Sequence, residues 1–294
     1  MEKCNLCPRE CLVRRQDGER GYCGMTRDIM IARADLHFWE EPCISGSSGS
    51  GAVFFTGCPL RCVFCQNHKI AIGRVGKLIS VDMLVDIFFK LKEKGANNIN
   101  LVTPTHYVPQ ICEALKYAKR KGLDLPVVYN TGSYERVDTL KLLEGLVDIY
   151  LPDCKYKSSE LSGRYSNAPD YFEVAGAAIE EMVRQVGEPV FDEYGMIKKG
   201  VIVRHMVLPG CTRDSKAVLK HLHDKYGNNI YISIMNQYTP VGELHGYPEL
   251  KRKITQREYD KVVDYAIDIG IENAFIQEGD TAKESFIPDF SDEL

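Results

Sequence analysis

Three cysteines stand at C-x3-C-x2-C spacing in the segment FFTGCPLRCVFCQNH, residues 54–68, directly after an apolar run. They are Cys58, Cys62 and Cys65. Thiolates are soft ligands that suit iron–sulfur clusters, and a closed metal site usually has four of them. Three thiolates would hold three irons of a cubane and leave the fourth iron open to a substrate or cofactor. The alternatives are a zinc site completed by a fourth ligand such as His68, or a structural cluster.

A second group of four cysteines lies near the N-terminus with the spacing C-x2-C-x3-C-x11-C, formed by Cys4, Cys7, Cys11 and Cys23. Four thiolates at this spacing predict a closed site, and either a tetrahedral zinc ion or a fully ligated 4Fe–4S cluster fits it. A zinc ion would stabilise a segment too small to have its own core, whereas a cluster could relay electrons or contact a partner. The four scattered cysteines are expected to be small buried apolar residues: Cys43, Cys112, Cys154 and Cys211.

Composition narrows the class of protein. The chain has 294 residues, a net charge of −4 and 44% hydrophobic residues, so it can form a large core but has no excess of basic residues for general nucleic-acid binding. No run approaches the roughly 18 apolar residues of a membrane-spanning helix, and the N-terminus lacks an apolar signal-peptide core. We therefore expect a cytoplasmic protein, where clustered cysteines bind metals rather than form disulfides.

From residue 52 onward, apolar β-prone runs alternate with segments of helical periodicity. Strands are expected in residues 52–57, 98–104, 126–132, 147–155, 200–210, 229–240 and 273–279, and helices in residues 80–95, 108–122, 137–145, 171–187, 215–227 and 255–270. This alternation predicts parallel strands with right-handed crossovers, in a doubly wound sheet or a complete or partial barrel. The Gly/Ser run at 45–51 is either a flexible linker or an ordered loop.

Polar residues follow the apolar strands where each strand ends. Ligands bind at the carboxyl ends of parallel strands, so these residues are expected to line one cavity. The candidates are Thr103, Thr105, Asn130, Asp153, Lys155, Arg204 and Gln237. Because side chains alternate along a strand, Asp153 and Lys155 should point the same way and Cys154 the other. For His106, His205 and Tyr238, the expected role is that of a polar residue satisfied within the protein, and the alternative is a substrate contact.

The cysteine loop, with the aromatic Phe64 before its third cysteine and a β/α pattern around it, resembles the radical S-adenosylmethionine (radical SAM) superfamily. Further segments resemble the glycyl-radical-enzyme activases of the pyruvate formate-lyase activating type, in a subfamily that also carries an N-terminal cysteine cluster. These segments are LHFWEEPCISGSSGSGAVFFTGCPLRCVFCQN, VYNTGSY, VDIYLPDCKY and VIVRHMVLPG. The similarity covers roughly residues 36–280.

The resemblance implies a partial (β/α)6-type TIM barrel over residues 36–294, with a cysteine-rich metal-binding head at 1–35. It also implies a 4Fe–4S cluster on Cys58, Cys62 and Cys65, with SAM bound at the open iron near Phe64 and the strand-end residues. Where many members have a Gly-Gly-Glu motif, this chain has VTPTHY, so Thr103, Thr105 or the Thr103 carbonyl would have to substitute. In place of one acid of a cation site found in such activases stands Tyr129.

The function that the resemblance implies is an oxidoreductase that cleaves SAM reductively to a 5′-deoxyadenosyl radical. The radical would take a hydrogen from a glycine of a partner glycyl radical enzyme, and a flavodoxin- or ferredoxin-type protein would supply the electron. One alternative is a radical SAM enzyme that acts on a small molecule, a peptide or a nucleotide. Another is an iron–sulfur electron-transfer protein without catalysis.

Overall fold

One twisted sheet organises the part of the chain that the computed structural model describes, residues 3–241, 244–277 and 290. Its strands are β1 (Ile29–His37), β2 (Ser50–Phe55), β3 (Lys77–Ile79), β4 (Ile99–Val102), β5 (Val127–Thr131), β6 (Ile149–Pro152), β7 (Val190–Phe191), β8 (Ile197–Met206), β9 (Tyr231–Met235) and β10 (Ala274–Ile276). They follow the order β10-β9-β8-β6-β5-β4-β2-β1-β3, and β7 pairs with β8 outside this path.

Pairing is parallel from β2 through β4, β5, β6, β8 and β9 to β10. The strands β1, β3 and β7 pair antiparallel. The two ends of the strand order, β10 and β3, do not pair with each other in the described residues, so the sheet is an open, partial barrel. This confirms the predicted α/β fold class.

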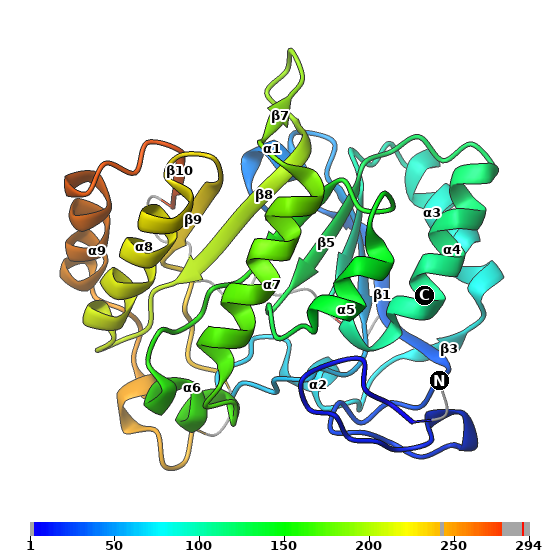
Figure 1. Cartoon of the computed structure of the whole chain (residues 1–294), viewed down its shortest axis with the longest axis horizontal. Coiled ribbons are helices and arrows are strands. Elements are labelled where there is room, and N and C mark those ends of the chain that lie inside the picture. Colours follow the sequence, from blue (N-terminus) through cyan, green and yellow to red (C-terminus); the bar gives the residue numbers. More distant parts are fainter. Residues whose placement is uncertain (1–2, 242–243, 278–289, 291–294) are drawn as a thin grey trace.

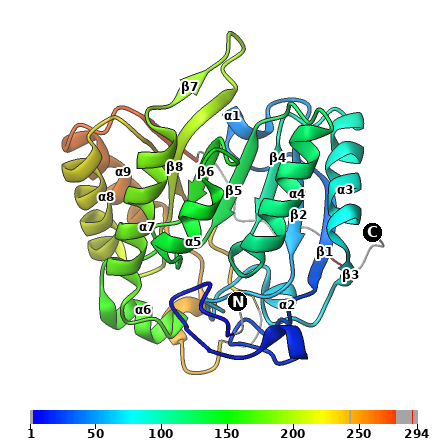
Figure 2. The ribbon, with the colours of Figure 1, turned by 45° about the vertical axis from the view of Figure 1, so that its right-hand side comes forward.

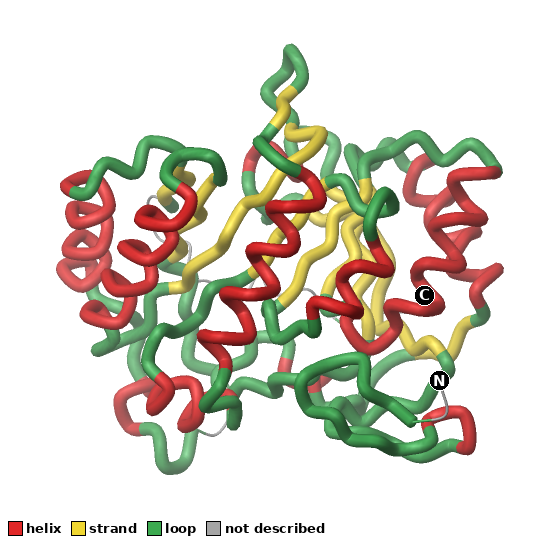
Figure 3. Tube along the Cα trace, viewed as in Figure 1, coloured by secondary structure: helices red, strands yellow, loops and turns green. Residues whose placement is uncertain are grey.

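Helices cover the outer face of the sheet, as Figures 1 and 3 show. The longer ones are α3 (Val81–Glu93), α4 (Val108–Arg120), α7 (Tyr171–Val186), α8 (Thr212–Tyr226) and α9 (Gln256–Asp268), and the shorter ones are α1 (Pro42–Ser45), α2 (His68–Ala71), α5 (Val137–Leu140) and α6 (Ser159–Ser166). Short 3₁₀ turns cover Arg15–Asp17, Thr105–Tyr107, Lys141–Leu143 and Pro248–Lys251. No helix in this described part is long and apolar enough to cross a bilayer.

Local sequence signals explain where these helices begin. The Ser80 hydroxyl accepts a hydrogen bond from the Met83 amide at 3.1 Å, so Ser80 is the N-cap of α3, as its position predicts. Thr255 and Glu258 form a capping box at the start of α9. The cost of unpaired helix-end amides is thereby reduced at both sites.

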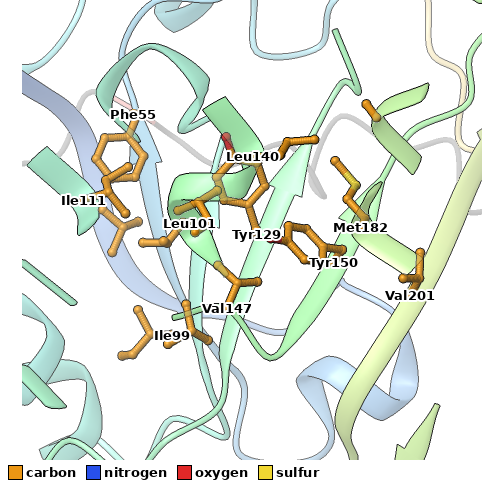
Figure 4. Packing of buried hydrophobic residues seen from close by; sticks show 14 of the residues in the cluster. Phe55, Ile99, Leu101, Ile111, Tyr129, Leu140, Val147, Tyr150, Met182 and Val201 are labelled. Carbon is orange, nitrogen blue, oxygen red and sulfur yellow. The ribbon is translucent and has the colours of Figure 1, made fainter. Parts of the chain in front are cut away.

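The main core lies between the strands and the outer helices. Tyr129 of β5 and Tyr150 of β6 pack edge to face there, with ring centroids 5.8 Å apart. Figure 4 shows them beside Ile111 of α4, Leu140 of α5 and Met182 of α7, all of which are fully buried. Burial of these apolar side chains fixes the sheet against its helices and so holds the strand ends in place.

The Gly/Ser run forms an ordered turn, which confirms the ordered-loop alternative and rules out the flexible linker. It joins α1 to β2, and Ser50 and Gly51 are buried. A Cβ on Gly51 would stand 2.7 Å from the Asn98 carbonyl oxygen, so only glycine allows this approach of two strands. The hairpin formed by β1 and β2, the short β3 and the helix α6 were not predicted.

The N-terminal head consists of loops and one 3₁₀ turn and leads into β1 at Ile29. Figure 2 shows it, in dark blue, at the edge of the sheet where α2 and α6 lie. The strand β1 includes the last residues of segment 1–35, so part of the predicted head belongs to the sheet. The division of the chain into a head at 1–35 and a barrel at 36–294 remains a prediction.

Candidate active site

A cavity of about 620 Å³ opens at the carboxyl ends of the parallel strands. All eleven residues predicted for the cluster and for SAM line it: Cys58, Cys62, Phe64, Cys65, Thr103, Thr105, Asn130, Asp153, Lys155, Arg204 and Gln237. They come from segments that follow β2, β4, β6 and β9 and from within β5 and β8. The sheet therefore brings together residues that lie up to about 180 positions apart in the sequence.

The three cysteines of the cavity lie on the loop between β2 and α2. The turn needs left-handed backbone at Gly57 and at Arg61, with φ of 93° and 51°. The Cys65 amide donates to the Cys62 carbonyl at 3.1 Å, and the Ser166 hydroxyl donates to the Cys62 sulfur at 3.0 Å. The loop thus has a defined shape that presents three thiols to one cavity.

Burial raises the pKa of the Cys58 thiol to about 11, with a further contribution from Cys62. Burial also raises the pKa of Cys65, and the neighbouring Cys58 and Cys62 add to it. These thiols therefore ionise at neutral pH only when positive charge is bound beside them. A bound metal cluster would supply such charge, and the Lys155 ammonium lowers the pKa of both thiols.

A network of buried charges forms the wall beside the cysteines. The Arg204 guanidinium donates to Asp153 Oδ1 at 3.0 Å, to Glu40 Oε2 at 3.0 Å and to Asn130 Oδ1 at 2.6 Å. Lys155 Nζ lies 2.5 Å from Asp153 Oδ2. The side chains of Arg204, Asp153 and Glu40 are 14%, 15% and 9% exposed, so little solvent screens these charges.

The pKa values of these groups follow from their pairing. Burial alone would raise the pKa of Asp153, but Lys155 and Arg204 outweigh it and hold that pKa below its usual range. Burial alone would lower the pKa of Lys155, but the Asp153 carboxylate raises it to about 12. All three side chains are therefore charged at neutral pH.

At the end of β4, Thr103 has a left-handed backbone with φ of 57°, which is rare for a β-branched residue. Thr103 stands where VTPTHY replaces the Gly-Gly-Glu motif, and it lines the cavity. The hydroxyl of Thr105 donates to Glu135 Oε1 at 2.6 Å, so it is already used inside the protein. Of the two threonines, Thr103 is thus the better placed to meet a ligand.

Glu135 is a buried carboxyl behind the cavity wall. Its Oε1 accepts hydrogen bonds from the hydroxyls of Thr105, Thr131 and Tyr129 at 2.6, 2.5 and 3.3 Å. Its Oε2 is buried and has no hydrogen-bond partner among the described residues. Burial raises the pKa of Glu135 to about 7, although the three hydroxyls oppose this shift.

Several residues near the site do not line the cavity. The rings of His106 and His205 bond the carbonyls of Thr56 and Cys154 at 2.7 Å each, and the Tyr238 hydroxyl donates to the Leu250 carbonyl at 2.6 Å. The Tyr238 hydroxyl is thus satisfied, as predicted, whereas Nδ1 of His106 and Nε2 of His205 are buried without a hydrogen-bond partner among the described residues. The ring of Phe64 does line the cavity and packs edge to face on Tyr238, with centroids 6.2 Å apart.

The structure also places His68, the alternative zinc ligand, and Cys154, which was expected to point away from the cavity. His68 is exposed and does not line the cavity with the three cysteines. Cys154 packs in the main core, on the opposite side of β6 from Asp153 and Lys155, as strand alternation predicts.

The acidic residues Glu40, Glu41 and Glu135 were not predicted as part of the site. Glu40 lies on the loop after β1 and lines the cavity together with Glu41. A signal was available, because two cations at strand ends, Lys155 and Arg204, need more than the single carboxylate of Asp153. The sequence alone does not say which acid supplies the second charge.

The four head cysteines lie outside this cavity and close to one another. Burial raises the pKa of Cys7 to about 12, and the thiols of Cys23 and Cys11 add to this shift. Burial also raises the pKa of Cys23, whose surroundings include Cys4 and Cys11. In residues 3–241, 244–277 and 290, no three His, Cys, Asp or Glu side chains converge as the ligands of one metal ion do. A 4Fe–4S cubane does not require such convergence, because each of its cysteines binds a different iron.

Comparisons with known proteins follow this geometry. The sequence profile of the Radical SAM superfamily matches residues 52–222. An uncharacterized protein of Methanocaldococcus jannaschii is 29% identical over 273 residues, which are 90% of this chain and 74% of that protein.

Solved structures show a similar fold at low sequence identity. The [FeFe]-hydrogenase maturase HydG is 16% identical with a TM-score of 0.52, over 78% of this chain and 52% of that one. Streptococcus suis SuiB, bound to the precursor peptide SuiA, is 16% identical with a TM-score of 0.52, over 76% and 47%. Methylornithine synthase (PylB) is 15% identical with a TM-score of 0.50, over 74% and 60%. This chain thus spans about half the length of the first two structures.

Proposed function

The chain belongs to the radical SAM superfamily, and we propose that it uses a 4Fe–4S cluster on Cys58, Cys62 and Cys65 to take a hydrogen atom from a glycine of a partner glycyl radical enzyme. The superfamily implies the cluster, SAM and radical chemistry. One observation carries the assignment of residues: three thiols on one loop face a cavity that also holds buried cations at the carboxyl ends of parallel strands.

The residues present are suited to both groups. Three soft thiols can hold three irons, and the cavity in front of them leaves room for a ligand at the fourth. When bound, the cluster and SAM supply a 5′-deoxyadenosyl radical by one-electron cleavage of SAM. The protein has to hold these groups, orient the substrate and keep water away.

Lys155 and Arg204 have different roles beside a ligand that carries a carboxylate. Three donor groups of Arg204 already bond Asp153, Glu40 and Asn130, so we assign Arg204 to fixing this wall. An ammonium has three donors, and Lys155 places one of them on Asp153. Its remaining donors and its nearness to Cys62 make Lys155 the candidate partner of the SAM carboxylate.

The shape of the cavity favours an extended chain segment as substrate. The lining includes His37 at the end of β1 and Phe38 and Trp39 after it. Across the open side of the sheet, it includes Phe275 and Ile276 of β10. Phe38 and Trp39 are 48% and 59% exposed, so apolar surface borders the opening. A loop that carries a glycine would enter between these two walls with its Cα toward the cysteine loop.

Transfer of deuterium tests this proposal. The reconstituted protein, SAM and a strong reductant are mixed with a candidate glycyl radical enzyme whose glycines carry deuterium on Cα. The proposal predicts a glycyl radical signal by electron paramagnetic resonance (EPR), together with deuterium in 5′-deoxyadenosine. SAM cleavage without either result, but with deuterium from a labelled small molecule, would replace the glycine by that molecule. The Cys62→Ala variant is the control for background cleavage.

A further inference from the structure

The N-terminal head is packed directly on the loop that carries Cys58, Cys62 and Cys65. The carbonyl oxygen of Cys23 stands 2.9 Å from the position that a Cβ on Gly57 would occupy. Gly57 immediately precedes Cys58. One van der Waals contact and one peptide unit therefore connect a cysteine of the head with a cysteine of the cavity.

A second connection runs through Arg9, which lies between Cys7 and Cys11 in the sequence. Its guanidinium donates to the Pro59 carbonyl at 2.8 Å and to the Ser166 carbonyl at 3.0 Å. The hydroxyl of the same Ser166 donates to the sulfur of Cys62. Hydrogen bonds thus link the segment between two head cysteines to a cysteine of the cavity.

The contact is reciprocal, because Arg61, on the same loop as Cys58, Cys62 and Cys65, reaches into the head. Its guanidinium carbon lies 5.3 Å from the centre of the Tyr22 ring, and Nη2 stands 2.6 Å from the position of a Cβ on Gly24. Tyr22 and Gly24 flank Cys23 on either side. Apart from the bond between Arg9 and Ser166, these contacts involve a cysteine of one group or a residue next to one.

The head cysteines have surroundings that stabilise a bound anionic centre. The Tyr22 amide donates a hydrogen bond to the Cys11 sulfur at 3.1 Å. Arg15 is buried beside Cys23, where its charge lowers the pKa of that thiol. Hydrogen bonds and positive charge of this kind raise the reduction potential of a thiolate-bound cluster.

The head contacts the loop that carries Cys58, Cys62 and Cys65 and also has a surface of its own that is open to solvent. Cys7 and Cys23 are buried, whereas Lys3, Arg14 and Arg20 on the same head are exposed. Figures 1 and 2 show the head below the strand ends, on the outer side of the α2 region. An electron donor that docks on this side meets the head first.

We infer that Cys4, Cys7, Cys11 and Cys23 hold a second, redox-active 4Fe–4S cluster that passes electrons to the cluster on Cys58, Cys62 and Cys65. An external donor of the flavodoxin or ferredoxin type gives one electron, which takes the head cluster from its 2+ to its 1+ state. The same electron then reduces the catalytic cluster, and the head cluster returns to 2+. No proton moves and no covalent bond changes. A zinc ion could stabilise the head, but it could not take part in this transfer because it has no redox chemistry.

Iron content and EPR of the full-length protein test this inference, and neither depends on SAM or on the substrate. The inference predicts about eight irons per chain in the wild type. It predicts about four in Cys4→Ser/Cys11→Ser and about four in Cys58→Ala/Cys62→Ala/Cys65→Ala. The reduced wild type should show magnetic coupling between two clusters, which both variants lack. Zinc in the head of protein purified without oxygen, with four irons per chain, would overturn the inference.

The relay itself is tested by rapid-mixing reduction with a reduced flavodoxin. With the head site loaded with zinc instead of iron, the head keeps its metal and its fold, and reduction of the catalytic cluster should slow at least tenfold. Cys211→Ser, which alters a cysteine outside both groups, should reduce at the wild-type rate. Equal rates in the zinc-loaded and iron-loaded proteins would overturn the relay.

Discussion

Replacement of Glu40 by glutamine tests whether the charge network holds the cavity wall. Glu40 accepts hydrogen bonds from Arg204 at 3.0 Å and from Asn130 and Asn100 at 3.1 Å each, and its side chain is 9% exposed. In Glu40→Gln, Oε1 can still accept from the two asparagines. The amide group, however, faces another donor on Arg204.

The magnitude follows from the loss of one partner of a buried ion pair. Such a loss costs about 3 kcal/mol, because the remaining charge stays buried without full compensation. We therefore expect the free energy of unfolding of Glu40→Gln to fall by about 3 kcal/mol, with a Tm several degrees lower. Differential scanning calorimetry at pH 7 measures this change. Glu113→Gln, an exposed position on α4, is the matched control and should stay within about 0.5 kcal/mol of wild type.

A double-mutant cycle with Arg204→Gln separates this pair from general damage. If the two side chains act on each other, the double variant should be less destabilised than the sum of the single variants by about 1–3 kcal/mol. Additive effects, or an unchanged Tm in Glu40→Gln, would refute the view that Glu40 neutralises Arg204.

Two further predictions concern Glu135 and Gly57. The pKa of Glu135 is about 7 in the folded protein against 4.5 for a free glutamate, so the folded state binds the proton more tightly and wild-type stability falls as pH rises through this range. Glu135→Gln does not titrate and should gain about 3 kcal/mol relative to wild type between pH 4.5 and 7 in urea denaturation; a pH-independent difference would contradict the buried, neutral carboxyl. In Gly57→Ala, the added methyl would stand 2.4 Å from Met25 Cγ at a φ of 93°, so we expect it to displace the head and lower iron content after reconstitution. Gly95→Ala has a similar φ of 85° with no atom within 4 Å, so it shows the backbone strain alone, and equal losses in both variants would rule out the head contact as the cause.

Much of the fold was predictable because its signals are local. Continuous apolar runs such as INLV at β4 and IYLP at β6 lie between glycines and helical periods, and they mark buried parallel strands. The strand β1 gave no such signal, since IMIARADLH mixes apolar and charged residues on a strand near the edge of the sheet. Side-chain alternation correctly separated Asp153 and Lys155 from Cys154.

The strand-end cations called for a further acid, but which acids belong to the site was not predictable, because their roles arise only from tertiary contacts. Glu40 and Arg204 are 164 residues apart in the sequence, and nothing near Glu40 indicates that it meets a guanidinium. Glu135 was overlooked for the same reason, because the Thr105 hydroxyl that bonds it follows another strand. Local patterns mislead in the head as well: its basic segment would be expected to be exposed, whereas Arg15 is buried and donates a hydrogen bond to the His106 carbonyl.

The central claim is that Cys58, Cys62 and Cys65 hold a catalytic cluster. The most direct test is the formation of 5′-deoxyadenosine by anaerobically reconstituted protein given SAM and a strong reductant, beside the Cys62→Ala variant. We predict product from the wild type and none above background from Cys62→Ala. Equal product from both proteins, or no product from a wild type that carries its full iron, would contradict the claim.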